Sequence, residues 1–152
     1  MFGRLKVPSE EEKLKLLIED AERFHGHLGP FLVIGVRMGR LAEKILFVEE
    51  KNIKLQVYAK LPVLTPFSCI LDRIQTTTKC TVGNQKLKVE NSQKEITAHF
   101  ELQKPNKSLK VTVNPKMIEE LINKISKGIS NEKLAWKMAY APENRLFIIE
   151  RQ

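Results

Sequence analysis

The sequence predicts an α+β domain, with N-terminal helices, a mostly antiparallel sheet and a helical C-terminal part. Apolar residues recur at helical spacing in the first 50 residues, alternate with polar ones through 52–114, and return to helical spacing over 115–141. Grouped helices and grouped strands, rather than strict alternation, are typical of α+β folds. The 152 residues are enough for one core, so we interpret 1–152 as a single domain.

Two helices are predicted at the N-terminal end. The first runs from Glu10 to about Phe24, because Ser9 followed by Glu12 three residues later is a capping-box pattern. The second begins at Pro30, a residue that suits the first turn of a helix, and ends near residue 47. It is apolar over much of its first three turns, so we expect it to be central.

Gly35 and Gly39 lie four residues apart on this second predicted helix. The charged neighbours Arg37 and Arg40 argue against a membrane-spanning helix pair. We therefore interpret the two glycines as a face that packs closely against another element.

The middle segment predicts strands and a short helix. A helix is expected over 65–78, behind Pro66, between two alternating stretches. The strands at 85–90 and 94–103 are expected to pair with each other across residues 91–93. The predicted strands span 52–61, 85–90, 94–103 and 107–114.

The C-terminal part predicts two helices and a last strand. One helix covers 115–128 and stops at Gly128, the next covers 131–141 and ends before Pro142, and a strand follows at 145–151. The helices at about 115–141 are expected to form a dimerisation element, which makes a homodimer our expectation. Core or dimer contacts are expected from Trp136, Met138 and Tyr140.

The charge is uneven along the chain. The net charge is +8, and residues 51–113 carry 11 Lys and Arg against 4 Asp and Glu. A basic sheet face could attract an acidic protein partner, an anionic ligand or nucleic acid. Because this segment is poor in arginines and in aromatic residues for base stacking, we favour a solvated, lysine-rich surface and do not expect nucleic acid binding.

The composition also bears on location. No apolar run approaches the ~20 residues of a membrane span. The first residues turn acidic at once and lack the apolar core of a signal peptide. Two cysteines are too few for a secreted disulfide framework, so we expect a cytoplasmic protein without membrane association.

His25 and His27 flank Gly26 in the joint between the two predicted helices. On a helix, residues i and i+2 point apart, whereas in an extended segment they fall on one side. Gly26 and the following Gly29-Pro30 indicate that the chain has left the first helix, so both imidazoles can converge on one point. Such a pair suits zinc or another divalent transition metal.

Cys69 is the best candidate for a third ligand. It falls in the first turn of the short predicted helix, where the positive helix end favours the thiolate. Asp72 shares its face and is predicted to be a fourth ligand, an acceptor for a histidine N–H, or a base acting on bound water. Asp72 is therefore the candidate catalytic residue.

Cys80 and His99 are weaker candidates. An unbroken helix would separate Cys80 from Cys69 by ~16 Å, which argues against a shared site and against a disulfide. We interpret Cys80 as structural. His99 stands alone in an alternating strand and is interpreted as a surface histidine.

Two blocks of sequence resemble the E-subunit family of formylmethanofuran dehydrogenase. The first reads FHGHLGPFLVIGVRMG, residues 24–39, and follows the family's Phe-His-Gly-His opening. The second reads CILDRIQTTTKCTVG, residues 69–83. Its matching residues are Cys69, Asp72, Ile74, Gln75, Thr78, Cys80, Thr81 and Gly83.

The resemblance implies an α+β domain with a metal site, with His25 and His27 as ligands and Cys69 in or next to the site. Two departures are expected to matter. Gly29 stands where the family has a cysteine, and the sequence ends without the cysteine-rich zinc ribbon that many members carry. The family's enzyme complex works at a tungsten or molybdenum centre in a different polypeptide, so the resemblance does not by itself imply that activity.

Three functional hypotheses follow. The leading one is a zinc-binding accessory or ligand-binding domain of one-carbon metabolism. The first alternative is a small zinc-dependent enzyme in which Asp72 assists a metal-activated water. The second alternative is a basic domain that binds nucleic acid or an acidic protein. In the leading hypothesis, the backbone N–H groups of residues 31–33 predict an anionic ligand beside the metal.

Overall fold

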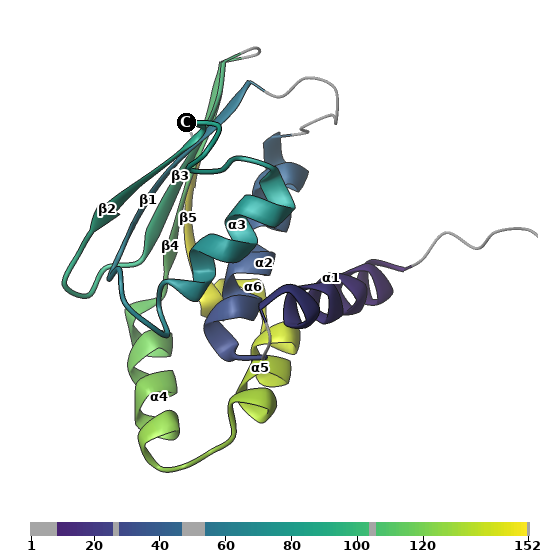
Figure 1. The fold of residues 1–152 in the computed structure, drawn as a ribbon, viewed down its shortest axis with the longest axis vertical. Helices are drawn as coiled ribbons and strands as arrows, with labels where there is room; N and C mark the ends of the chain where they lie inside the picture. Colours follow the sequence, from purple (N-terminus) through teal and green to yellow (C-terminus); the bar gives the residue numbers. More distant parts are fainter. Residues whose placement is uncertain (1–8, 26–27, 47–53, 104–105, 152) are drawn as a thin grey trace, which may run out of the picture.

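The computed structural model describes residues 9–25, 28–46, 54–103 and 106–151. One five-stranded sheet is covered by helices on one face and is open on the other (Figure 1). The predicted α+β class is therefore confirmed. None of the helices in the described ranges is long and apolar enough to cross a membrane.

Both N-terminal helices form as predicted, as α1 (Glu10–His25) and α2 (Pro30–Leu46). The Ser9 hydroxyl accepts a hydrogen bond from the Glu12 N–H at 3.1 Å, and the Glu12 carboxylate accepts one from the Ser9 N–H at 3.4 Å. The capping box is thus confirmed. Twelve of the 17 residues of α2 are buried, so this helix is the centre of the helical layer.

Five strands form the sheet, namely β1 (Leu55–Leu61), β2 (Leu87–Asn91), β3 (Thr97–Leu102), β4 (Lys107–Val113) and β5 (Phe147–Arg151). Its strand order is β2-β1-β3-β4-β5, with β1 parallel to β2 and every other pair antiparallel. Buried residues alternate along the strands and pack under α2.

The predicted pairing of the second and third strands is wrong. β2 and β3 lie on opposite sides of β1, and Val57 is opposite Leu87 on one side and Phe100 on the other. The cause is α3 (Cys69–Thr78), which carries the chain back across the helical layer so that β2 runs parallel to β1. Alternation identifies a strand but does not identify its partner.

The C-terminal helices are α4 (Pro115–Ser126), α5 (Asn131–Tyr140) and the short α6 (Glu143–Leu146). Asn114 and Ser130 cap α4 and α5 through their side chains. Gly128, at φ 84°, follows α4 as its predicted stop. Leu134, Ala135, Met138 and Ala139 of α5 are buried, so α5 belongs to the core.

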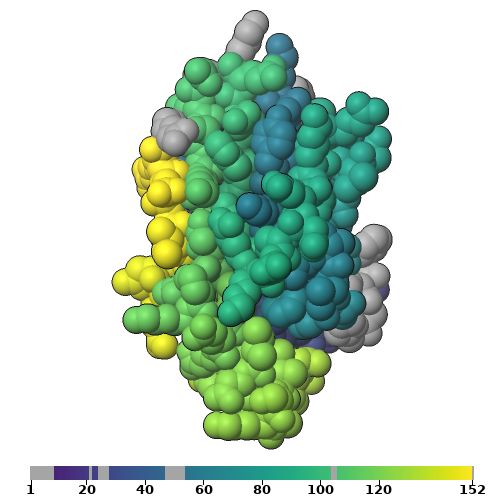
Figure 2. All heavy atoms as spheres, turned by 90° about the vertical axis from the view of Figure 1, so that its left-hand side faces the viewer, coloured from purple at the N-terminus to yellow at the C-terminus, as the bar shows by residue number. Residues whose placement is uncertain are grey.

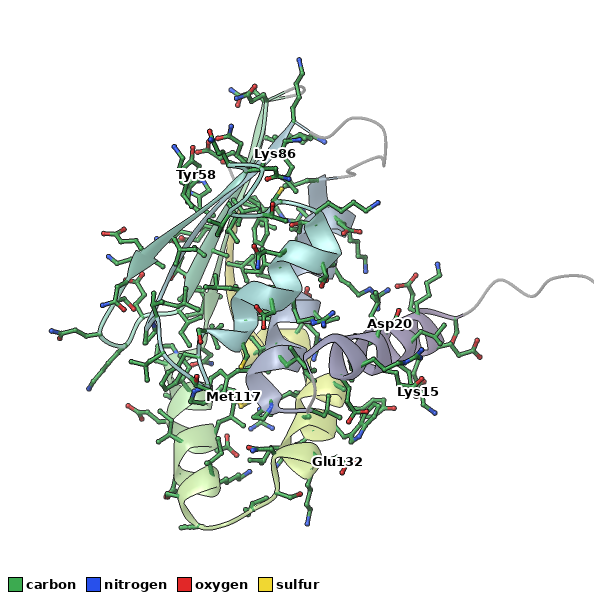
Figure 3. The ribbon with its side chains drawn as sticks, in the orientation of Figure 1. Lys15, Asp20, Tyr58, Lys86, Met117 and Glu132 are labelled. Atoms are coloured by element: carbon green, nitrogen blue, oxygen red, sulfur yellow. The ribbon has the colours of Figure 1, made fainter. Side chains whose placement is uncertain are left out.

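The open face of the sheet carries mixed charge. Lys60 Nζ lies 3.8 Å from the Glu95 carboxylate, and Lys110 Nζ lies 3.8 Å from that of Glu150 on the neighbouring strand. Tyr58 of β1 is exposed on the same side (Figure 3), and Figure 2 looks onto this side of the molecule. The lysines that gave the middle segment its positive charge are thus interleaved with carboxylates, and this face is not uniformly basic.

Candidate functional site

The position of Cys69 depends on how closely α3 packs against α2. A Cβ atom at Gly35 would lie 2.6 Å from the Ile70 carbonyl oxygen, and one at Gly39 would lie 2.7 Å from Thr77 Cβ. Only glycine allows this approach without movement of a neighbour. The predicted close-packing face is confirmed, and its partner is α3.

This packing sets the first residue of α3 beside the first residues of α2. Cys69 and the pair Gly29-Pro30 line one small cavity of about 30 Å³. Phe31 also lines this cavity, and its ring packs edge to face against that of Phe67, with 5.0 Å between the ring centroids. Residues about 40 positions apart in sequence are therefore neighbours, and the α2 side of the contact closely follows His27.

The two histidines of the predicted metal site lie at the limit of what the structure describes. His25 is the last residue of α1, one residue beyond the predicted helix end. The His25 side chain and residues 26–27 lie outside the described residues, so the convergence of the imidazoles stays a prediction. Among the described residues, no three His, Cys, Asp or Glu side chains lie close enough together to hold a metal ion.

Asp72 and Cys69 share a second, outer hollow of about 410 Å³. The carboxylate is close enough to the sulfur to raise the pKa of the Cys69 thiol. A sulfur and a carboxylate oxygen that line the same hollow suit a divalent cation, which would stabilise the thiolate and the carboxylate together. The hollow is lined by Thr65, Ser68, Cys69, Leu71, Asp72, Gln75 and Val82.

The prediction that the helix start makes Cys69 a thiolate is wrong for the metal-free protein. Burial raises the pKa of the Cys69 thiol most, and Asp72 raises it further. The hydrogen bond from the backbone at the helix start lowers the pKa as expected, but it is the smallest of the three effects. A metal ion would have to displace the thiol proton on binding.

Cys80 lies in a different environment. It is fully buried, its Sγ atom is 3.3 Å from the Leu55 carbonyl oxygen, and burial raises its thiol pKa. Both cysteines are reduced thiols. Cys80 follows the left-handed Lys79 at the end of α3 and lines neither hollow at Cys69, which agrees with its structural interpretation.

The start of α2 offers little room for the predicted anion. Phe31 and Leu32 are each only 1% exposed, and Val33 donates its N–H to the Gly29 carbonyl at 3.3 Å. A cavity of about 30 Å³ holds a water molecule but not a carboxylate or phosphate. Space for a ligand lies on the outer side of Cys69 instead.

The sequence did not predict that Gln75 and Val82 line this outer hollow. The Gln75 side-chain oxygen accepts a hydrogen bond from the Val82 N–H at 3.1 Å, which holds the loop after α3 against the helix. Val82, 60% exposed, thereby joins the lining. Gln75 is one of the matched positions of the second sequence block, which is the signal that could have indicated this role.

Comparison with known families covers both parts of this site. The family model described as "FmdE, Molybdenum formylmethanofuran dehydrogenase operon" matches residues 24–147. The chain belongs to the FmdE family. The match includes both histidines, Cys69, Asp72 and every strand up to the start of β5, so the family's domain corresponds to nearly the whole described fold.

Two individual proteins extend the comparison. A probable S-adenosyl-L-methionine-binding protein of Archaeoglobus fulgidus is 30% identical over 162 residues, which cover 93% of this chain and 44% of that protein. The chain thus spans less than half of that relative. An FmdE-like protein of Syntrophus aciditrophicus, of the tungsten formylmethanofuran dehydrogenase type, shares the fold, with a TM-score of 0.64, 17% identity, and coverage of 91% of this chain and 71% of that one.

Proposed function

We propose that this FmdE-family chain is a zinc-binding domain, or a binder of another divalent transition metal, with Cys69, His25 and His27 as ligands. The observation that carries the proposal is the shared cavity of Cys69 and Gly29-Pro30. It puts the thiol beside the chain that follows the two histidines, and sulfur with imidazole nitrogen is a donor set that suits zinc.

Asp72 decides what such a site does. As a fourth protein ligand it would close the site, whereas with water in the fourth position it would accept a proton from that water. The first arrangement supports an accessory or ligand-binding domain, which we favour. The second supports a small zinc-dependent enzyme. An anionic ligand next to the metal would enter from the outer hollow of about 410 Å³.

S-adenosyl-L-methionine is a second candidate ligand. It is supported by the likeness to the probable S-adenosyl-L-methionine-binding protein of Archaeoglobus fulgidus, which aligns over 93% of this chain. The outer hollow combines the apolar side chains of Leu71 and Val82 with the Asp72 carboxylate, whose charge suits a cationic sulfonium or amine. A role in one-carbon metabolism, a cytoplasmic location and a homodimeric state belong to the same proposal.

Elemental analysis of the purified protein tests the metal site. Wild type is expected to hold about one zinc per chain, and His25→Ala/His27→Ala or Cys69→Ala is expected to lose most of it, because removing one of three ligands typically weakens a zinc site strongly. His99→Ala and Cys80→Ala are the matched controls, since each removes the same residue type away from Cys69. Equal zinc in all variants would contradict the proposal.

Calorimetry tests the ligand separately. Metal-loaded and metal-free protein are each titrated with S-adenosyl-L-methionine and with small carboxylates. Binding of a carboxylate to the loaded form alone supports an anion on the metal. Binding of S-adenosyl-L-methionine that is weakened by Asp72→Asn supports the second candidate, and no binding of either at millimolar concentration removes both.

A further inference from the structure

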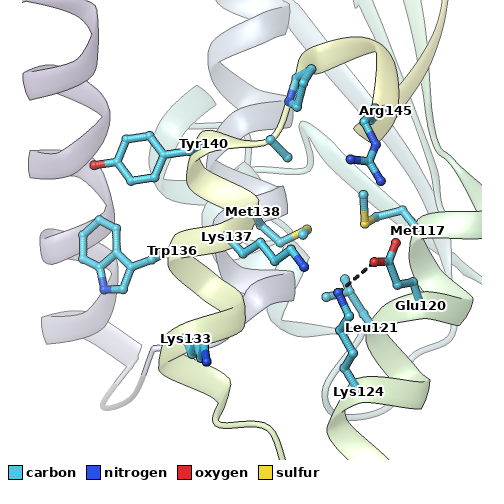
Figure 4. Close-up of a pocket in the computed structure, with 12 residues that line it drawn as sticks. Met117, Glu120, Leu121, Lys124, Lys133, Trp136, Lys137, Met138, Tyr140 and Arg145 are labelled. Carbon is cyan, nitrogen blue, oxygen red and sulfur yellow. Dashed lines mark hydrogen bonds and ion pairs between the residues drawn. The ribbon is translucent and has the colours of Figure 1, made fainter.

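A groove lies between α4 and α5, on the part of the molecule formed by the C-terminal helices (Figure 4). Its volume is about 640 Å³, which falls in the usual range for small-molecule sites. Among the described residues, none lines both this groove and either hollow at Cys69. Apolar side chains of Met117, Leu121 and Met138 form its floor, and these are buried.

The groove carries an excess of positive charge. Its described lining includes four cations and a single carboxylate, Glu120, so three positive charges remain in surplus. Glu120 accepts a hydrogen bond from Lys124 Nζ at 2.8 Å, and this bond is the main reason that the pKa of Glu120 is lowered. The four cations are Lys124, Lys133, Lys137 and Arg145.

The cations come from three different helices and meet in one place. Figure 4 shows Lys124 of α4, Lys137 of α5 and Arg145 of α6 directed into the gap between α4 and α5. The neighbouring Lys124 lowers the pKa of Lys137. Neighbouring ammonium groups repel each other, and an anion placed between them would relieve that repulsion.

The arrangement also limits the kind of anion. Charges that converge from three helices match a compact group with several oxygens better than the spaced carboxylates of an acidic peptide. The floor beneath them is aliphatic. Trp136 and Tyr140 stack on each other, 6.4 Å between ring centroids, on the other side of α5 in Figure 4, so these two rings provide no platform inside the gap.

We propose that the groove between α4 and α5 binds an organic phosphate, with the phosphoryl group held by Lys124, Lys137 and Arg145 and an aliphatic part against the apolar floor. This site is independent of the metal site at Cys69. Its failure would leave the proposed function untouched, and failure of the metal site would leave this one untouched.

Titration with hexyl phosphate and with inorganic phosphate tests the proposal. Calorimetry measures occupancy of the groove, because the Trp136 ring lies on the other side of α5 and is a poor reporter of the gap. Both probes are expected to bind saturably, with hexyl phosphate about tenfold tighter because its chain leaves water for the apolar floor.

Charge-neutralising variants supply the control. Lys124→Gln/Lys137→Gln, and separately Arg145→Gln, are expected to weaken both probes by about tenfold or more. Lys60→Gln/Lys110→Gln removes the same charge from the open sheet face and is expected to change nothing. Circular dichroism checks that each variant is folded.

Three outcomes would overturn the proposal. The first is no saturable binding of either probe up to about 10 mM, which is weaker than most specific sites. The second is an equal loss of affinity in the sheet-face control, which would show that net charge alone attracts the probe. The third is tighter binding of a glutamate-rich peptide than of hexyl phosphate, which would assign the groove to an acidic protein partner.

Discussion

Gly35 of α2 and Ile70 of α3 touch through their backbones, because a Cβ at position 35 would stand 2.6 Å from the Ile70 carbonyl oxygen. Ile70 directly follows Cys69 in the chain. The contact therefore fixes both the spacing of the two helices and the position of the thiol next to the start of α2. The candidate site rests on this backbone contact as much as on its own side chains.

Gly35→Ala is expected to lower the free energy of unfolding by about 1–3 kcal/mol, since the added methyl group overpacks a contact made by backbone. Urea denaturation measures the change. Gly83→Ala is the control, because the nearest atom to its Cβ would be 3.8 Å away. A Gly35→Ala protein as stable as the control would show that α3 can shift freely.

Arg37 is predicted to hold α5 against α2. Its Nη1 atom donates hydrogen bonds to the carbonyl oxygens of Met138, at 2.9 Å, and of Ala141, beyond the end of α5. Arg37→Met keeps the apolar part of the side chain but leaves both carbonyls without this donor. We expect a loss of about 2–3 kcal/mol in urea denaturation. An effect no larger than that of exposed Lys88→Met would contradict this role.

Cys69 is predicted to react faster with alkylating reagents than Cys80 in metal-free protein. The reason is access, because burial raises the pKa of both thiols but Cys69 borders two hollows whereas Cys80 is fully enclosed. Asp72→Asn removes a charge that raises the pKa of Cys69, so it should speed alkylation several-fold at neutral pH. Peptide mapping over time measures both, and earlier labelling of Cys80 would reverse the assignment.

Stability is predicted to fall at alkaline pH, in part through Cys80. Its pKa is raised in the folded protein, so the unfolded thiol ionises at lower pH than the folded one. The stability present below the unfolded pKa of about 8.5 is lost as pH rises toward the folded pKa. Denaturation between about pH 7.5 and 10 should show a shallower fall for Cys80→Ala than for wild type, and equal slopes would exclude this contribution.

Local patterns predicted the helices and strands well because each depends on neighbouring residues. Ser9 and Glu12 mark a helix start that depends on hydrogen bonds between these two residues. Pro30 favours the start of α2 because its ring fixes a backbone angle that suits the first turn. Strand pairing was not predictable in the same way. The partner of β1 depends on where α3 returns the chain, which no alternation of residues encodes.

Two residues of the candidate site were predictable from the sequence, but their environment was not. Spacing and the second sequence block indicated Cys69 and Asp72, which do share a hollow. The raised pKa of Cys69 was missed because burial, which is set by the contact of α3 with α2, outweighs the helix start. The α4–α5 groove was missed because Lys124, Lys137 and Arg145 come together only in the folded chain.

X-ray absorption at the zinc edge of the zinc-loaded protein tests the proposal that Cys69 and the two histidines bind one metal ion, because sulfur and nitrogen neighbours are distinguished by distance. We expect one sulfur at about 2.3 Å and two imidazole nitrogens at about 2.0–2.1 Å from the zinc. The sulfur should be lost in Cys69→Ser, and the imidazoles should be lost in His25→Ala/His27→Ala. A zinc environment without sulfur, or one unchanged in both variants, would contradict this site.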